Sequence, residues 1–462
     1  MKNISKIISI VFLNFSILLL CYVFYRSQVV HFGAKFDYYL KYYIIAFLFI
    51  ILSFISFFIP EKLKINITIV FTSTIICLYI VEGYFVTNYL IKTLKDNRFE
   101  IYKNNTGQNY DKRSKFQIYN DLKKENPNIA VTIVPSFFLS DKNLNYLPLS
   151  GLSNRKTISC NENGYYSIYQ SDRFGFNTPD EEWDKDEIEF FLVGDSLTHG
   201  DCVNEPDTIS GNLRKLINNE NGVLNLGQGA NGPLIEYATL REYLPHVKVK
   251  RVLWLFHGND LLFSNELKNQ ILVTYLKDKD FTQNLFLKKQ FTQELLLQKL
   301  KEKSFIRGSE RFHRRKPLIE FLILTNVRTF LIERFFSSSA SAPNELKLYL
   351  MKEFENIIKL SNELAKENNS KFYFIYFPYY ERYKDHVYAH DLSTYKKAIE
   401  KAIEIVENLN VPIINLNKEL FEKQKDPLSF FPFRLPNSPH FNESGYELIA
   451  NIIFNKIEEF EK

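Results

Sequence analysis

The chain has 462 residues, of which 45% are hydrophobic and 24% are charged. This length suits two or three structural units, and the composition excludes a chain that is disordered throughout. The formal net charge of +5 is small for such a length. It does not favour a nucleic-acid-binding protein, because such proteins concentrate basic residues on one face.

Three apolar segments open the chain. Residues 7–25 and 42–59 contain no charged residue, and residues 65–91 contain only Glu82. A helix needs roughly 20 apolar residues to cross a bilayer core, so we expect a membrane anchor of three transmembrane helices within residues 1–95. The alternative is a buried helix hairpin of a soluble protein. No small-residue cleavage site follows the first segment, which favours a retained anchor over a removed signal peptide.

The charges beside these segments do not decide on which side of the membrane the rest of the chain lies. With a cytoplasmic N-terminus, the loops on the cytoplasmic side hold fewer basic residues than the loops on the other side. Positive-inside counting therefore slightly opposes that orientation. The cytoplasmic group would be Lys2, Lys6, Lys62 and Lys64, and the opposite group Arg26, Lys35, Lys41, Lys92, Lys95 and Arg98.

Strand and helix patterns alternate from residue 186 onward, after a polar, turn-rich region over residues 96–185 that we expect to pack on the following domain. Such alternation is typical of a parallel sheet with crossover helices, so we expect residues 186–462 to form an α/β domain. The strands are expected at residues 187–193, 223–226, 249–256, 371–377 and 411–416, and the helices at 208–218, 234–244, 345–368, 393–409 and 443–460.

Residues 262–343 interrupt this alternation with a helical pattern. Basic residues cluster between Arg307 and Lys316, and residues 318–336 alternate apolar and charged side chains. The second stretch is able to lie on a membrane surface. We favour instead a helical insertion that packs on the core of the domain.

Polar loops follow the first three predicted strands. The tripeptide Gly-Asp-Ser ends at Ser196, a glycine-rich loop covers residues 227–232, and Asn259 follows the third strand. Ligands bind beyond the carboxyl ends of parallel strands, so these loops are expected to converge on one crevice. A nucleophilic serine also needs a base and donors for the oxyanion. His440, shortly before the last helix, is the candidate base.

These four segments, in this order, resemble blocks I, II, III and V of the SGNH hydrolases, also called GDSL-type esterases. The resemblance covers residues 186–462, apart from the insertion, and implies a flavodoxin-like α/β/α fold. It also implies that Ser196 attacks an acyl carbonyl and that His440 is first the general base and then the acid for the leaving alkoxide. The implied oxyanion donors are the backbone N–H of Ser196, a backbone N–H at Gly229 or Ala230, and the side-chain amide of Asn259.

One position departs from the family pattern. The family usually has an aspartate three residues before the histidine, where this chain has Asn437. A carboxylate orients the imidazole and stabilises its cation, whereas an asparagine brings no charge. The departure predicts a Ser–His dyad in which Asn437 or a backbone carbonyl orients His440, a slow enzyme, or a protein that does not hydrolyse esters.

We expect no metal and no cofactor. His199 and His257 flank the predicted crevice, but no set of carboxylate and histidine ligands accompanies them, and the cysteines lack a zinc-binding spacing. Cys160 and Cys202 lie in the polar part of the chain and are either a disulfide or two unrelated thiols. We favour the disulfide, which would place the domain outside the cytoplasm.

The predicted protein is therefore a multi-pass protein of the cytoplasmic membrane with a periplasmic or extracytoplasmic SGNH-type serine esterase domain. By analogy with SGNH domains attached to bacterial membrane segments, its substrates would be acyl, most simply acetyl, esters of envelope glycans or lipid-linked sugars. One alternative is an O-acetyltransferase of surface polysaccharide that works with a membrane acyl-donor protein. Others are a lipase-like enzyme acting on the bilayer and a non-catalytic assembly module in polysaccharide export. No nucleic-acid partner is expected.

Overall fold

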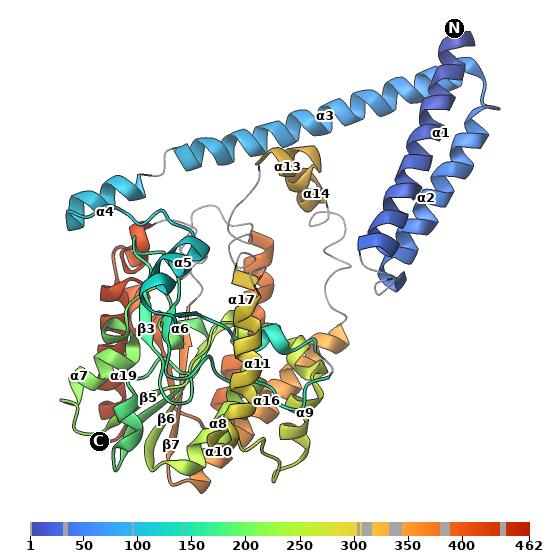
Figure 1. Cartoon of the computed structure of the whole chain (residues 1–462). Helices are drawn as coiled ribbons and strands as arrows, with labels where there is room; N and C mark the ends of the chain where they lie inside the picture. The colour runs from blue at the N-terminus through green and yellow to red at the C-terminus, as the bar shows by residue number, and fades with distance from the viewer. Residues whose placement is uncertain are drawn as a thin grey trace. The chain divides into compact units, whose positions relative to one another are not determined.

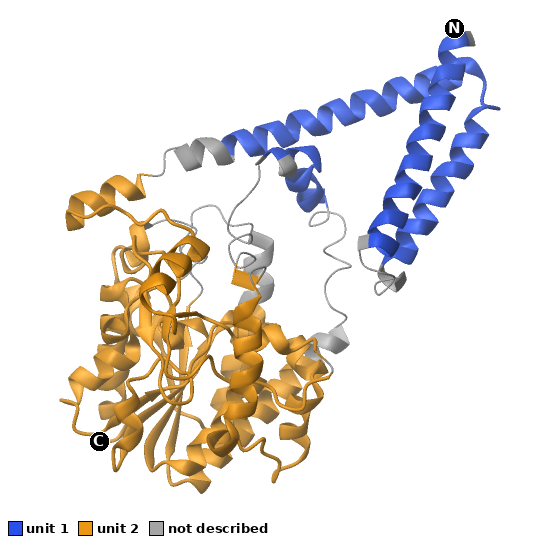
Figure 2. Ribbon diagram, viewed as in Figure 1, with its two compact units in different colours: residues 1–95, 316–338 blue, residues 96–315, 339–462 orange. Residues whose placement is uncertain are grey.

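The computed structural model describes residues 2–30, 36–94, 97–141, 143–302, 305–306, 317–331, 344–378, 389–434 and 440–462. The chain divides into two compact units, which Figure 2 shows in different colours. The first unit contains residues 1–95 and 316–338, and the second contains residues 96–315 and 339–462.

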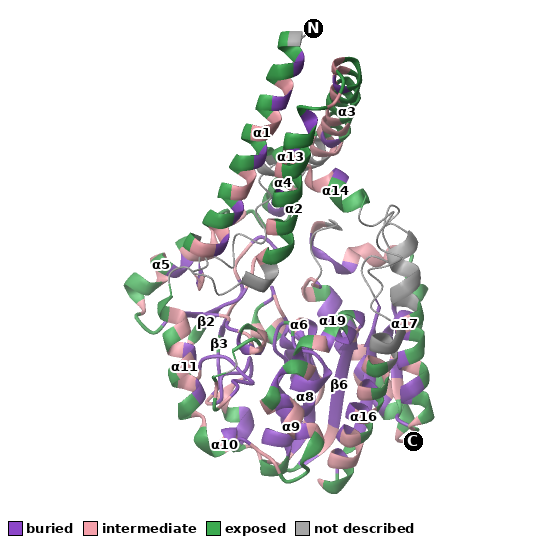
Figure 3. Ribbon diagram, turned by 90° about the vertical axis from the view of Figure 1, so that its right-hand side faces the viewer, coloured by how far each residue is buried: buried purple, intermediate pink, exposed green. Residues whose placement is uncertain are grey.

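Three long helices make up most of the first unit: α1 (Lys2–Phe24), α2 (Phe36–Ser56) and α3 (Glu61–Leu94). A short π-helix (Tyr25–Val30) follows α1. Stretches of 27, 18 and 28 residues in this unit are long and apolar enough to cross a membrane. In an 18-residue apolar window of each span, only between 6% and 22% of the residues are buried, which argues against a buried soluble hairpin. Figure 3 shows that most residues of these helices are exposed, whereas the strands of the second unit are mostly buried.

Two further helices of the first unit come from the insertion. α13 (Pro317–Leu322) and α14 (Thr325–Leu331) pack on α3. The prediction that the insertion packs on the core of the α/β domain is therefore wrong for residues 317–331. The physical reason is a set of hydrogen bonds between Glu82 of α3 and the beginning of α14.

A five-stranded parallel sheet of order β5-β4-β6-β7-β8 forms the centre of the second unit. Its strands each begin and end within two residues of the predicted positions, and the predicted α/β fold class is confirmed. The strands are β4 (Ile188–Gly194), β5 (Gly222–Asn225), β6 (Val249–His257), β7 (Lys371–Phe377) and β8 (Ile413–Asn415).

Helices cover both faces of this sheet (Figure 1). Successive side chains of a strand point to opposite faces, so the apolar run of residues 190–193 in β4 contributes side chains to two cores. Phe190 and Leu192 pack with α7 (Ile209–Leu216) and α19 (Glu443–Phe460) on one face. Phe191 and Val193 pack on the other face with α8 (Pro233–Tyr243), α16 (Asn344–Glu367) and α17 (Ala389–Asn408).

The polar region before the sheet belongs to the same unit. It contains α4 (Arg98–Thr106), α5 (Lys115–Glu125) and a small sheet of β1 (Ala130–Val131), β2 (Lys156–Ile158) and β3 (Ile168–Gln170). Its side chains Leu147 and Phe176 lie in the same core as residues of β4 and β6. Shorter helices of the unit are α6 (Ser196–His199), α9 (Gln270–Lys277), α10 (Leu285–Lys288), α11 (Gln290–Lys301) and α18 (Leu416–Glu419).

Candidate active site

Ser196 begins α6, directly beyond the carboxyl end of β4. The strand ends at Gly194, where an added Cβ would lie only 2.6 Å from the carbonyl oxygen of Leu255 in β6. Glycine is therefore required for the close approach of the two strands. Asp195 Oδ1 accepts the backbone N–H of Leu197 at 2.9 Å and caps the turn. These local constraints hold Ser196 at the rim of the sheet.

The predicted oxyanion-hole residues gather around Ser196 because β4 lies between β5 and β6. A Cβ added to Gly229, in the loop after β5, would lie 4.0 Å from Ser196 Cβ. Ala230 follows with a left-handed φ of 58°, which turns the chain there. From the loop after β6, Asn259 Nδ2 donates to Asp195 Oδ2 at 3.4 Å. The three predicted loops thus meet at one rim.

The loop after β6 is braced by its own side chains. Asp260 Oδ2 accepts the backbone N–H of His257 at 2.7 Å. His257 Nδ1 contacts Asn259 Oδ1, so the amide nitrogen of Asn259 is the end that faces Asp195. This arrangement orients Asn259 as a donor, which is the role that an oxyanion hole requires.

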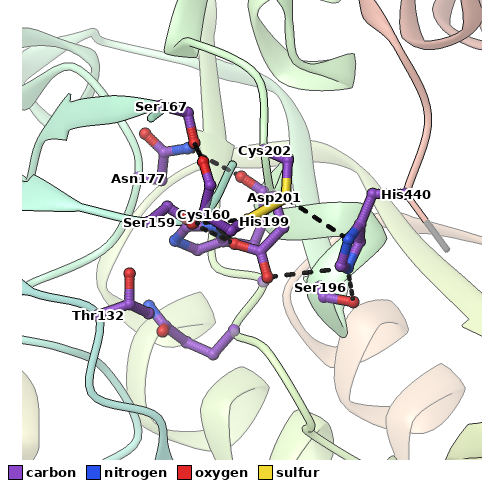
Figure 4. A network of polar contacts seen from close by, with 12 residues as sticks. Thr132, Ser159, Cys160, Ser167, Asn177, Ser196, His199, Asp201, Cys202 and His440 are labelled. Atoms are coloured by element: carbon purple, nitrogen blue, oxygen red, sulfur yellow. Dashed lines mark hydrogen bonds and ion pairs between the residues drawn. A yellow bond between two sulfur atoms is a disulfide. The ribbon is translucent and has the colours of Figure 1, made fainter. Parts of the chain in front are cut away.

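His440 reaches the same rim from the other end of the domain. Its Nε2 lies 2.9 Å from Ser196 Oγ, although 244 residues separate the two in the chain (Figure 4). Nearby, Asn442 caps α19 by accepting the backbone N–H of Gly445 at 2.9 Å, which anchors the segment that carries the imidazole. At this distance the serine hydroxyl can donate to the imidazole and pass its proton.

A carboxylate that sequence reasoning missed faces the other nitrogen of this imidazole. His440 Nδ1 lies 3.0 Å from Glu162 Oε1, and the backbone N–H of His440 donates to Glu162 Oε2 at 3.3 Å. Asn437, the predicted orienting residue, lies outside the described residues. Glu162 occupies the position of the acid in a Ser–His–acid arrangement, so the described site is more than the predicted dyad. The one signal in the sequence was that Glu162 stands two residues after Cys160.

A disulfide joins Cys160 to Cys202 beside these residues. It connects the β2–β3 loop, which carries Glu162, to the segment that follows α6. Cys202 Sγ lies 3.7 Å from His440 Nδ1 (Figure 4). Two cysteines and a histidine lie within metal-binding range of one another here, but sulfur in a disulfide is not the thiolate that binds a metal. The disulfide instead holds the loop that supplies Glu162.

A second carboxylate lies on the Nε2 side of His440. Asp201 Oδ2 is 3.9 Å from His440 Nε2, while Asp201 Oδ1 accepts from Ser159 Oγ at 2.7 Å. The same Oδ1 atom lies 3.0 Å from His199 Nδ1. The His199 ring is fully buried and meets the ring of Tyr169 edge-on. His199 is therefore a buried neighbour of Asp201 beside the site.

These carboxylates control the protonation of His440. Burial lowers its pKa, but the charge and hydrogen bond of Glu162 and the charges of Asp201 and Asp195 raise it, and the net effect is a pKa of about 9. Burial raises the pKa of Asp201, whereas His199 and His440 lower it, and the result lies well below the usual range. His440 is therefore an imidazolium in the resting site at neutral pH and must lose a proton before it acts as a base.

No family model matches the chain, and no curated protein matches it. Among solved structures, the chain is similar to the lipase/acylhydrolase from Enterococcus faecalis, with 13% identity, a TM-score of 0.32 and coverage of 59% of this chain and 96% of that one. The esterase EstA from Pseudoalteromonas sp. shows 11% identity, a TM-score of 0.29 and coverage of 60% and 98%. A carbohydrate acetylesterase family member from Sinorhizobium meliloti shows 8% identity, a TM-score of 0.27 and coverage of 59% and 98%.

Proposed function

We propose that this protein is a membrane-anchored serine esterase of the SGNH type that forms an acyl-enzyme at Ser196. The observation that carries the proposal is the chain of contacts from Ser196 Oγ through the imidazole of His440 to the carboxylate of Glu162. Nucleophile, base and orienting acid each have a side chain in the required order. The blocks of sequence that resemble the SGNH hydrolases supply the same two central residues.

The reaction proceeds by two acyl transfers. Neutral His440 accepts the proton of Ser196 as Oγ bonds to the acyl carbon, and the protonated imidazole gives that proton to the leaving alkoxide as the ester bond breaks. Water then attacks the acyl-enzyme and loses a proton to His440, which returns it to Ser196. Backbone N–H groups at Ser196 and Gly229 or Ala230, with the Asn259 amide, stabilise the oxyanion in each step.

The substrates proposed are acyl esters, most simply acetyl esters, of envelope glycans or lipid-linked sugars. Three helices that are long and apolar enough to cross a membrane support a domain held at a membrane surface. The disulfide supports a compartment outside the cytoplasm, where the acyl-bearing molecules at that surface are lipids and glycans. An O-acetyltransferase would form the same acyl-enzyme, and a sugar hydroxyl would then attack it in place of water.

The test is covalent labelling of the full chain in membranes with a serine-directed fluorophosphonate, in which Ser196 Oγ displaces fluoride from phosphorus. We expect Ser196→Ala to lose at least about 90% of the label and Ser429→Ala, a change away from the described site, to keep it. Equal labelling of the Ser196→Ala variant would overturn the enzyme proposal and favour an assembly module.

Turnover of an aryl acetate, measured with and without an oligosaccharide acceptor, then distinguishes hydrolysis of the acyl-enzyme from transfer of its acyl group to a sugar. A hydrolase gives free acetate at the same rate in both arms. A transferase gives faster turnover and an acetylated sugar when the acceptor is present.

A further inference from the structure

The helical hairpin α13–α14 lies along one face of α3 within the first unit. Tyr79 Oη of α3 donates to the carbonyl oxygen of Leu322 at 2.9 Å, and the Tyr79 ring lies 5.3 Å from the ring of Phe321. A Cβ added to Gly83 would lie 3.7 Å from the same Phe321 ring. Tyr79 and Gly83 are four residues apart and therefore share one face of the helix.

Glu82, on the same part of α3, is the only charged side chain between residues 65 and 91, and it is fully buried. Its Oε1 accepts from the backbone N–H and the side-chain amide of Asn326 at 3.1 and 2.7 Å. Its Oε2 accepts from the backbone N–H of Val327 at 2.8 Å. An ionisable side chain in a membrane span is costly unless protein groups surround it. The hairpin supplies those groups.

These contacts fix the position of the hairpin along α3. Glu82 lies seventeen residues beyond Ile65, where the apolar stretch begins, which is about 26 Å along a helix axis. The hydrocarbon core of a bilayer is about 30 Å thick. With Ile65 at one edge of the hydrocarbon core, Glu82 and the beginning of α14 fall just inside the opposite edge.

The exposed side chains of the hairpin are mostly large and apolar, with Arg328 and Thr329 of α14 exposed beside them. Large hydrophobic side chains are exposed on both of its helices, and the neighbouring turns of α3 expose Ile80 and Tyr84. The hairpin surface therefore continues the apolar surface of a helix that is long enough to span the membrane. Its exposed members are Leu318, Leu322, Ile323, Phe330 and Leu331. Lipid is the occupant that suits an apolar surface at this depth.

We propose that α13–α14 is seated in the bilayer against α3 and gives the α/β domain a second attachment to the membrane. The chain leaves the second unit after residue 315 and returns to it at residue 339, so the hairpin is joined to that unit on both sides. The α/β domain is thus tied to the bilayer by the segment after α3 and by both ends of this insertion. The inference stands independently of ester cleavage.

Fluorescence quenching tests this attachment in the full chain. Cys21 and Cys77, the free cysteines, are first replaced by alanine, and Cys160 and Cys202 are protected by their disulfide. A single cysteine is then introduced by Leu318→Cys or, as the matched control in the second unit, by Leu287→Cys. The two leucines are 72% and 71% exposed. Each variant is labelled with bimane in detergent and reconstituted into phosphatidylcholine–phosphatidylglycerol vesicles.

We expect doxyl-labelled lipid to quench the bimane at position 318 at least about threefold more strongly than the bimane at position 287, and aqueous iodide to do the reverse. Iodide quenching at position 318 equal to that of the control would overturn the proposal. So would quenching by neither reagent, which would show that protein, such as a second copy of the chain, covers the hairpin. Ile323→Cys provides a second probe on the same surface if Leu318→Cys does not fold.

Discussion

His440 lies between a serine hydroxyl and two carboxylates, and this environment sets how the site responds to pH. The protonated imidazole is stabilised by Glu162 at 3.0 Å and by the charges of Asp201 and Asp195. The raised pKa means that protonated His440 stabilises the folded state fully below about pH 6.5, and that this contribution is lost as the pH rises through about 9. Catalysis has the opposite requirement, because the base must be neutral.

We predict that esterase activity rises with pH and is half-maximal near pH 9. Glu162→Gln removes the carboxylate that raises the pKa of His440, so the midpoint should move to lower pH. The plateau should fall by about 10²- to 10⁴-fold, because the imidazolium formed in the reaction loses its counter-charge. Initial rates of aryl acetate hydrolysis between pH 5 and pH 10 measure both effects.

The matched control is Glu443→Gln. Glu443 accepts a hydrogen bond from Tyr165 at 2.6 Å and is not among the charges with the largest effect on the pKa of His440. Its removal should leave the midpoint unchanged. A Glu162→Gln variant with an unchanged midpoint and plateau would show that Glu162 does not position the base.

At the scale of secondary-structure elements, the β2–β3 loop is the part of the polar region that matters most for the site. It carries Glu162 on a loop with little regular structure, and the Cys160–Cys202 disulfide ties that loop to the segment after α6. A disulfide that closes a loop of this size restricts the unfolded chain. It also keeps the carboxylate next to the imidazole.

Replacing both cysteines, Cys160→Ser with Cys202→Ser, should lower the free energy of unfolding by about 2–4 kcal/mol. Activity should fall as well, because the loop that carries Glu162 is released. Thermal unfolding and aryl acetate hydrolysis of the purified full chain measure the two effects. The double change Cys21→Ser with Cys77→Ser, at the free cysteines, should alter neither. Full activity without the disulfide would contradict a role in holding Glu162.

For the molecule as a whole, the three candidate spans would, if all of them cross the membrane, put the N-terminus and the α/β domain on opposite sides of it. The count of basic residues near the spans slightly opposes an outward-facing domain, whereas the disulfide favours it. A disulfide persists in an oxidising compartment, so we give it more weight than the small difference in charge.

Cysteine labelling in intact cells decides between these orientations. In a background with Cys21→Ala and Cys77→Ala, we expect Leu287→Cys to react with a membrane-impermeant maleimide. Lys6→Cys, at the beginning of α1, should react only after permeabilisation. The reverse pattern would place the domain in the cytoplasm and would refute the proposed location.

Local sequence patterns were sufficient to predict many of the structural elements of this protein. The apolar spans, the alternating strands and helices, and the loops that hold Ser196 and Asn259 depend on short-range periodicity and on turn residues, which are written in contiguous stretches. The place of His440 shortly before the last helix made it the candidate base, and the resemblance to known sequence blocks implied the same role. Tertiary structure alone decided that Glu162 faces His440 and that Glu82 holds α14. Each of those contacts joins residues more than 240 positions apart in the chain. Such contacts arise from how whole elements pack, and a local pattern carries no information about them.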